Sequence, residues 1–326
     1  MRIALITDPW RADYPLSIRG PYYESQNHVT DNIAEAITGL GHIFKHLEAG
    51  QALQDALVRF NPNLIFNRSN CIDTETGVAS TPYLLDRLRI PYTGPNPQSS
   101  VNACHKSLTK EILHQLKIPT PKYIVIHDPN CIEIPDDLTF PLFIKPIIGG
   151  CSLGIEGENL VYRKESCKTI CSNLINNFKR PVIIEEFISG REFTVGILGN
   201  ENPKILPLLE FVNLSQDTHF FRSFTSKMIV GKYEKKSCPA VIANRQGNQI
   251  KAMALKAYQG IGCRDYARID IRLNKNNRPL ILEVNAFPSL LSSGSSYGSM
   301  ASAAGLSFED LIRQILRIAS KRYHLN

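Results

Sequence analysis

Hydrophobic and polar residues alternate along two segments near the C-terminus, residues 267–273 and residues 279–285. This period of two is typical of half-buried strands, and the polar residues 274–277 between the segments predict a hairpin turn. We expect Leu273 to pair with Arg278 across this turn. The side chains then expected to point into the core are Ile269, Ile271, Leu282 and Val284.

The opposite face of the predicted hairpin carries charged and amide side chains. In the expected pairing, Arg268 lies opposite Glu283, and Asp270 lies diagonal to it within side-chain reach. Asn285 follows on the same face. Two carboxylates and an amide oxygen suit a hard divalent cation such as Mg2+. The alternative is an ordinary amphipathic hairpin whose arginine and glutamate form a solvated pair.

The N-terminal part of the chain alternates between short apolar strands and segments with helical spacing. Residues 2–7 and 63–67 predict strands, and residues 29–40 and 84–88 predict helices. A loop rich in Pro, Gly and Tyr is expected after the first strand, through Glu24. Strand, helix, strand and helix in this order imply a parallel sheet that is covered by helices.

Length and composition predict more than one domain. The 326 residues are 43% hydrophobic and 21% charged, as in soluble globular proteins, and a chain of this length forms roughly two or three compact units. A stretch rich in Pro, Asn and Ser at residues 91–100 predicts the first boundary. We expect domains at residues 1–95, 96–187 and 188–326.

The net charge and the cysteine spacing limit which binding partners and which cell compartment we expect. The net charge of +7 suits anionic ligands such as nucleotides, but it is too diffuse to indicate nucleic-acid binding. No apolar run reaches membrane-spanning length, and the N-terminal residues lack a signal-peptide cleavage site. The eight cysteines form no Cys-x-x-Cys pair. We therefore expect a cytoplasmic protein with reduced thiols and no membrane partner.

A glycine-rich segment directly follows a strand in the middle of the chain. The predicted strand at residues 141–146 carries Lys145, and the Gly-Gly-Cys-Ser-Leu-Gly segment at residues 149–154 comes next. Backbone N–H groups of such a loop can surround phosphate oxygens, and the lysine adds a positive charge beside them. The spacing differs from that of a Walker loop, and glycine-rich turns also occur without a ligand.

Acidic residues stand at the end of the following strand. An apolar run from residue 181 ends in Glu185 and Glu186, and Glu192 begins another predicted strand. These groups can bind an adenine edge and a ribose hydroxyl, or they can form a charged strand end in solvent. Residues 213–240 form a long basic segment that predicts a lid or a disordered loop.

The ordered set of these features resembles a known family. It comprises Lys106, Lys145 with its glycine-rich loop, the acids at residues 185–192, Ala-Arg-Ile-Asp at 267–270 and Leu-Glu-Val-Asn at 282–285. In this order the set resembles the ATP-grasp superfamily, and within it the D-alanine–D-alanine ligases. The likeness extends from about Pro91 to the C-terminus. It implies an α/β (α+β ATP-grasp) fold with an N-terminal parallel α/β domain, a small central α+β domain and a C-terminal domain built on an antiparallel sheet.

The resemblance implies a nucleotide site with three parts. The phosphates of ATP would be contacted by Lys106 and Lys145. The loop that covers the phosphates would contribute Gly150, Cys151, Ser152 and Gly154. The adenosine would be held by Glu185, Glu186, Phe187 and Ile188 at adenine and by Glu192 at ribose.

The resemblance also implies a metal site and a reaction centre. Asp270, Glu283 and Asn285 would bind two Mg2+ ions, or Mn2+ in their place. Arg268 would face the reaction centre, with Ser152 and the lid residue Lys227 as further catalytic residues. The family suggests a homodimer that acts on small-molecule substrates.

The substrate loops depart from the family pattern. The acid that grips the first amino group in the family is absent, and Glu24 is the nearby acid that could replace it. The serine-rich segment after residue 286 suits a carboxylate pocket or a solvated loop. By comparison with the family, the candidate substrate residues there are Ser289, Ser293 and Ser295.

Three functions follow from these features. The first is an ATP-dependent, ADP-forming ligase that joins an amino acid or another carboxylate to an amine through an acyl phosphate. The second is a genuine D-alanine–D-alanine ligase of peptidoglycan synthesis. The third, of another class, is a catalytically inactive ATP-binding module.

Overall fold

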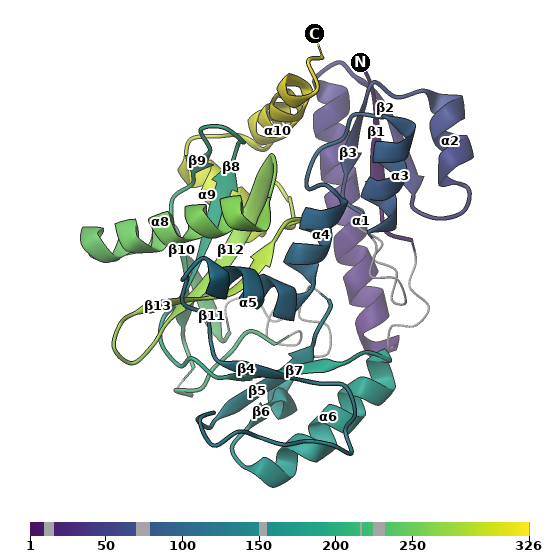
Figure 1. Cartoon of the computed structure of the whole chain (residues 1–326). Coiled ribbons are helices and arrows are strands. Elements are labelled where there is room, and N and C mark those ends of the chain that lie inside the picture. Colours follow the sequence, from purple (N-terminus) through teal and green to yellow (C-terminus); the bar gives the residue numbers. More distant parts are fainter. Residues whose placement is uncertain (10–15, 70–78, 150–154, 216, 224–231, 326) are drawn as a thin grey trace.

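The computed structural model describes residues 1–9, 16–69, 79–149, 155–215, 217–223 and 232–325. In these residues three β-sheets follow one another along the chain, and helices pack around them (Figure 1). The second sheet lies at the bottom of the view in Figure 1, far from both termini. None of the described helices combines the length and the apolarity needed to cross a membrane.

The first sheet is parallel and lies in the N-terminal part of the chain. Its elements are β1 (Arg2–Thr7), α1 (Leu16–Gly39), β2 (Ile43–Glu48), α2 (Leu53–Phe60), β3 (Leu64–Asn67) and α3 (Ser80–Leu88). The strand order is β2–β1–β3. Because successive side chains of a strand point to opposite faces, Ile3 and Leu5 of β1 pack with α1, whereas Ala4 and Ile6 pack with α2 and α3.

The loop predicted through Glu24 is wrong, because α1 already begins at Leu16. The first turns of this helix contain Gly20 and Pro21, residue types that are common in loops. Packing overrides that local preference, since the same helix buries Val29 and Ile33 against the first sheet. Glu24 therefore lies on a helix, with its side chain exposed.

The second sheet is antiparallel and is covered on one face by a helix. Its elements are β4 (Tyr123–Ile126), β5 (Leu142–Pro146), the short 3-10 helix Gly157–Asn159, β6 (Leu160–Val161), α6 (Lys164–Phe178) and β7 (Val182–Glu186). The strand order is β4–β7–β5–β6. Ile144 and Ile184 pack with α6. By the alternation of the strands, Lys145 and Glu185 point away from that helix.

The third sheet is also antiparallel and is covered on both faces. Its strands are β8 (Glu192–Leu198), β9 (Lys204–Ile205), β10 (Leu209–Asn213), β11 (Glu234–Ser237), β12 (Tyr266–Leu273) and β13 (Pro279–Asn285). The strand order is β11–β10–β8–β12–β13, and β9 pairs with β8. The helices around it are α4 (Pro97–Cys104), α5 (Lys106–Gln115), α8 (Asn244–Ile261), α9 (Ser296–Ala303) and α10 (Phe308–Arg322). One core joins a face of the sheet to α4, α5 and α8, and another joins the opposite face to α1, α9 and α10.

The predicted domain limits stay a prediction. Each sheet lies within one of the ranges 1–95, 96–187 and 188–326. However, α4 and α5 of the middle range contribute Ala103 and Leu113 to the core beneath the third sheet. The helices α4 and α5, which connect the first sheet to the second, therefore pack against the third sheet.

The predicted hairpin is present, but its expected register is wrong. Leu273 pairs with Pro279 rather than Arg278. The turn is one residue longer than expected because the side-chain oxygen of Asn274 accepts hydrogen bonds from the N–H groups of Asn276 and Arg278, both at 2.9 Å. Arg278 is thereby held inside the turn.

A bulge shifts the register of the hairpin once more. It lies between Asp270 and Ile271, so that Asp270 pairs with Glu283 while Ile271 pairs with Ile281. Leu282 has no partner across the ladder and is only partly buried, whereas Ile281 is buried in the core. The expectation that Leu282 faces the core is wrong. Because of the bulge, the two acids lie directly opposite each other instead of diagonally.

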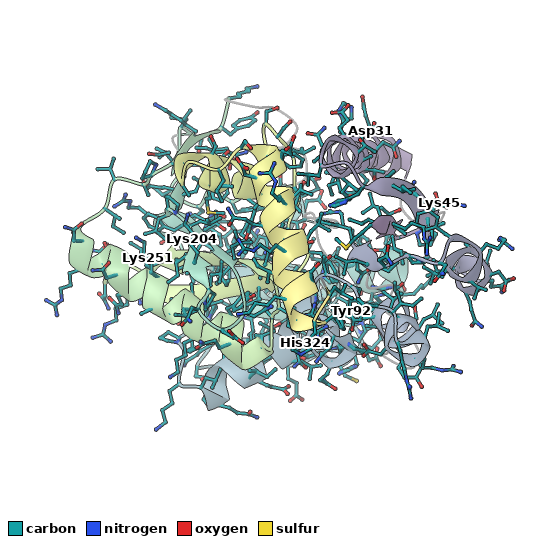
Figure 2. The ribbon with its side chains drawn as sticks, turned by 90° about the horizontal axis from the view of Figure 1, so that it is seen from above. Asp31, Lys45, Tyr92, Lys204, Lys251 and His324 are labelled. Carbon is teal, nitrogen blue, oxygen red and sulfur yellow. The ribbon has the colours of Figure 1, made fainter. Side chains whose placement is uncertain are left out.

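A buried carboxylate connects the first part of the chain to the third sheet. Asp265 is fully buried and accepts hydrogen bonds from the Gly94 N–H group and from Arg322 of α10, both at 2.8 Å. Arg322 also donates to the Tyr92 carbonyl at 2.8 Å. Figure 2, seen from above, shows Tyr92 beside the end of α10, next to His324. The segment at residues 92–94, which follows the first sheet, is thus fixed to the end of α10.

Candidate active site

Three lysines and one glutamate form a buried cluster between α5 and the second sheet. The Glu185 carboxylate forms ion pairs with Lys145 and with Lys110, the latter at 2.8 Å. Lys106, one turn before Lys110 on α5, donates to the carbonyl oxygen of Gly149 at 3.2 Å. All four charged residues are buried. Three cations therefore face a single anion in a region with little water.

Burial and neighbouring charges shift the titration of this cluster. Burial, together with the positive charge of Lys145, lowers the pKa of Lys106 to about 8. Burial would raise the pKa of Glu185, but the adjacent Lys110 and Lys145 outweigh it and lower that pKa to about 2. Excess positive charge in a poorly hydrated site attracts an anion such as phosphate. The cluster lies where the chain enters the predicted phosphate loop, residues 150–154, which is outside the described residues.

The second part of the site is the polar face of the hairpin. Asp270 and Glu283 pair across β12 and β13, and Arg268 pairs with Asn285 in the same way. The Asn285 amide donates to Asp270 at 3.0 Å and to Glu283 at 3.2 Å. All three side chains of the predicted metal set are therefore brought together. Lys110 donates to the Thr120 hydroxyl at 2.9 Å, and that hydroxyl donates to the Ile281 carbonyl of β13 at 2.8 Å, which places the hairpin beside the lysine cluster.

Arg268 holds Asp270 in its ionised form. Its guanidinium donates to both carboxylate oxygens, at 2.9 and 2.7 Å, and the Thr194 hydroxyl donates to the same carboxylate at 2.6 Å. Burial acts against the charge, yet Arg268 holds the pKa of Asp270 well below its usual range. An ionised acid at neutral pH is what a metal ligand requires.

The donor set fits a hard divalent cation. Two carboxylates and one amide supply oxygen ligands of the kind that Mg2+ prefers. Among the described residues, no group of three or more His, Cys, Asp or Glu side chains is placed to hold a metal ion. Asn285 directs its NH2 group at the acids. An ion would therefore bind with this amide turned and with the Arg268–Asp270 contact loosened.

The predicted adenosine residues lie at the end of β7 and the start of β8. The N–H group of Phe187 donates to the Pro141 carbonyl at 3.0 Å, and that of Glu186 donates to Lys122, also at 3.0 Å. In the described part of the chain, the N–H group of Ile188 makes no such bond, which leaves it free for a ring nitrogen. Glu185 is committed to the lysines. Contact between its carboxylate and adenine stays a prediction.

Aromatic side chains from the lid segment pack against this strand end. Phe221 lies edge-on to Phe143 of β5 with ring centroids 4.8 Å apart, and it also contacts Phe187. His219 packs against Phe187 at 5.9 Å and against Tyr162 at 5.6 Å. The first part of the predicted lid thus lies against the second sheet. Lys227 and Ser152 fall outside the described residues.

The predicted substrate residues occupy the segment that follows β13. Ser295 is buried and caps α9, because its hydroxyl oxygen accepts a hydrogen bond from the Gly298 N–H group at 3.0 Å. Ser289 is half-buried, and Ser293 is exposed. Ser295 therefore has a structural partner, and substrate contacts for all three serines stay predictions, as does that of Glu24 on α1.

Four residues of this region were missed as candidates. Lys110 and Arg272 lie in ion pairs with predicted nucleotide residues, Lys236 donates to the Gly294 carbonyl, and Asp8 accepts a hydrogen bond from Ser69 at 2.5 Å. The sequence could have indicated Lys110, because it stands one helical turn after Lys106. The partners of the other residues are distant in sequence, and no local pattern indicates them.

Comparison with known proteins gives relatives for most of the chain. A family model described as the D-ala D-ala ligase C-terminus matches residues 112–317. A D-alanine–D-alanine ligase of Carboxydothermus hydrogenoformans is 35% identical over 72% of this chain and 75% of its own length. An uncharacterized protein, y4sG of Sinorhizobium fredii, is 29% identical over 92% of this chain and 90% of its own length.

Solved structures share the fold over nearly the whole chain. A D-alanine–D-alanine ligase from Bacillus anthracis, complexed with ATP, has a TM-score of 0.75 at 21% identity and covers 99% of both chains. The VanG D-Ala:D-Ser ligase from Enterococcus faecalis has a TM-score of 0.74 at 20% identity and covers 98% of this chain and 99% of its own. The expected fold class and the resemblance are confirmed. The chain belongs to the D-alanine–D-alanine ligase family.

Proposed function

We propose that this protein is an ADP-forming ligase that joins a carboxylate, such as an amino acid, to an amine. The observation that carries the proposal is the buried excess of cations, Lys106, Lys110 and Lys145 around Glu185, next to the paired acids Asp270 and Glu283. The lysines suit the phosphates of ATP. The acids suit the divalent cation that accompanies these phosphates.

Each part of the site has one task in this proposal. Lys106 and Lys145 bind the phosphates, and Lys110 holds Glu185 so that the lysines stay in place. Asp270, Glu283 and Asn285 would hold Mg2+, which supplies charge neutralisation between the phosphate oxygens when bound. Positioning and electrostatic stabilisation of this kind account for most of the catalysis of phosphoryl transfer.

The reaction needs no nucleophilic side chain. An oxygen of the substrate carboxylate attacks the γ-phosphorus of ATP, the bond to ADP breaks, and an acyl phosphate forms. The amine nitrogen then attacks the acyl carbon, loses a proton, and inorganic phosphate leaves as the amide forms. Arg268 would stabilise the oxyanion of the tetrahedral intermediate. To do so it must exchange part of its contact with Asp270 for the intermediate.

The substrate pocket would lie between the first sheet and the segment after β13. Asp8 and Ser69 follow the ends of the neighbouring parallel strands β1 and β3, and ligands of parallel sheets bind at that edge. Arg68 donates to the Pro288 carbonyl at 3.0 Å. By the resemblance, Asp8 and Arg68 stand in segments where the family carries different substrate-loop residues. We infer that D-alanine does not fill both substrate positions.

ADP release tests the proposal directly. The purified protein is incubated with ATP, Mg2+ and pairs drawn from a panel of D- and L-amino acids and simple amines. We expect ADP release that depends on both a carboxylate and an amine, with the amide seen by mass spectrometry. Turnover with D-alanine alone would select the peptidoglycan ligase instead. ATP binding without ADP release under any condition would indicate the inactive module and would refute the proposal.

A further inference from the structure

Arg272 on β12 is a buried cation to which the proposed reaction gives no task. Its side chain is 6% exposed. Its Nε atom donates to Oε2 of Glu192 at 2.8 Å, and a terminal nitrogen lies 2.7 Å from the same oxygen. Both contacts therefore use one oxygen of the residue that is expected at the ribose. In the described part of the chain, no hydrogen bond is donated to the other oxygen, Oε1.

The remaining guanidinium donors reach two backbone carbonyls. One terminal nitrogen donates to Ile188 at 2.8 Å, and the other donates to Phe220 at 2.9 Å. The guanidinium carbon also lies 5.1 Å from the centre of the Phe187 ring. Arg272 thus touches three residues of the proposed adenosine site and one residue of the lid segment. Only arginine has a planar fork with enough donors for such a set.

The contact with Phe220 fixes the lid segment where it covers the adenosine residues. His219 and Phe221, on either side of Phe220, both pack against the Phe187 ring. The carbonyl of Phe220 points instead to Arg272. A single side chain therefore holds the lid segment, the strand end and the ribose carboxylate in one arrangement.

We propose that Arg272 is a positioning residue that sets the recognition of the ribose hydroxyls. It anchors one oxygen of Glu192 and leaves the other free to accept a hydrogen bond from the ribose, while it holds the lid segment through Phe220. Without this anchor the carboxylate turns freely, and the hydroxyls lose a pre-oriented acceptor. This proposal rests on the proposed function, since it assumes that ATP binds along Ile188 and Glu192.

Nucleotide selectivity provides the test. Dissociation constants for ATP, 2′-deoxy-ATP and 3′-deoxy-ATP are measured by calorimetry on the full chain and on Arg272→Gln. We expect the wild type to prefer ATP over at least one deoxy analogue and the variant to lose about tenfold or more of that preference, as for a hydrogen bond to a charged group. The KM for ATP should rise, with little change in the KM of the carboxylate and the amine.

Arg322→Gln is the matched control. Like Arg272, Arg322 contacts a carboxylate (Asp265), a backbone carbonyl (Tyr92) and an aromatic ring (Tyr323). It lies, however, at the end of α10. Its loss should lower stability and leave nucleotide selectivity unchanged. Arg272→Lys keeps the charge and the fold but cannot reach all three acceptors, so it should also lose selectivity.

The possible outcomes distinguish a failure of the role of Arg272 from a failure of the proposed ligase function. Unchanged selectivity in Arg272→Gln or in Arg272→Lys, in a protein whose wild type binds ATP, would overturn the role of Arg272 alone. The role of Arg272 would also be overturned if Arg322→Gln lost as much nucleotide selectivity as Arg272→Gln. It would be overturned as well if the wild type bound ATP and its deoxy analogues equally. A wild type that binds no ATP would overturn the proposed function as well.

Discussion

Replacement of Glu185 by glutamine should destabilise the ligand-free protein more than any single surface change. Glu185 is the shared partner of Lys110 and Lys145, and all three side chains are buried. The variant leaves two buried cations without a counter-charge. Breaking a buried ion pair in this way typically costs about 3–5 kcal/mol.

The pKa of Glu185 gives a similar magnitude by another route. A pKa that falls from 4.5 to about 2 on folding corresponds to about 3 kcal/mol of folding free energy, at about 1.4 kcal/mol per pH unit. Because the folded-state pKa is the lower one, this contribution is complete above pH 4.5 and is lost as the pH falls from 4.5 towards 2. Glu185→Gln should therefore show a flatter dependence of stability on pH in this window.

Urea unfolding followed by circular dichroism measures both effects. The matched control is Asp137→Asn, which breaks the ion pair with Lys122 near the same sheet; those side chains are 70% and 57% exposed. Loss of such an exposed pair should cost no more than about 1 kcal/mol. If Glu185→Gln is destabilised no more than Asp137→Asn, or if its stability follows the wild-type pH dependence below pH 4.5, the description of the cluster as a charge-balanced core is wrong.

Three further predictions concern the nucleotide, the metal and the fold. Because burial lowers the pKa of Lys106 to about 8 and bound phosphate favours its charged form, ATP affinity should fall above pH 8 by up to about tenfold per pH unit. Calorimetry across that pH range checks this, and Lys106→Arg, which stays charged, should flatten the profile. Glu283→Gln should lower ADP release by at least about 100-fold with an unchanged circular dichroism spectrum, and wild-type turnover would remove the metal assignment. Ser307→Ala removes the cap of α10, where the serine oxygen accepts from the Asp310 N–H group at 3.0 Å, and should cost about 1 kcal/mol in urea unfolding; an unchanged midpoint would contradict that.

Local signals in the sequence were sufficient for several elements. The strand predicted at residues 2–7 begins and ends where the apolar pattern places it, as β1. The predicted helix at residues 84–88 forms the end of α3, and Ile269 and Val284 are buried in the core as expected. Each of these features depends on residues within a few positions of one another.

Elements whose environment is set from a distance were missed or misplaced. The strand β2, Ile43–Glu48, lies at the edge of its sheet and is largely exposed, so its sequence carries no clear alternation. The register of the hairpin depended on the Asn274 side chain and on a bulge, neither of which periodicity predicts. The candidate site followed the same rule. The paired acids were anticipated, whereas the partners of Lys110 and Arg272 were not.

Three acids of the proposed site are each oriented by a cation before any ligand arrives. Lys110 and Lys145 hold Glu185, Arg268 holds Asp270, and Arg272 holds Glu192. These contacts fix the direction of the carboxylates, which lowers the cost of ordering them when a ligand binds. They also differ in one respect. A metal ion at Asp270 would compete with Arg268 for the same oxygens, whereas a ribose hydroxyl at Glu192 would take the oxygen that Arg272 leaves free. Metal binding should therefore release Arg268 towards the reaction centre, while nucleotide binding leaves Arg272 in place.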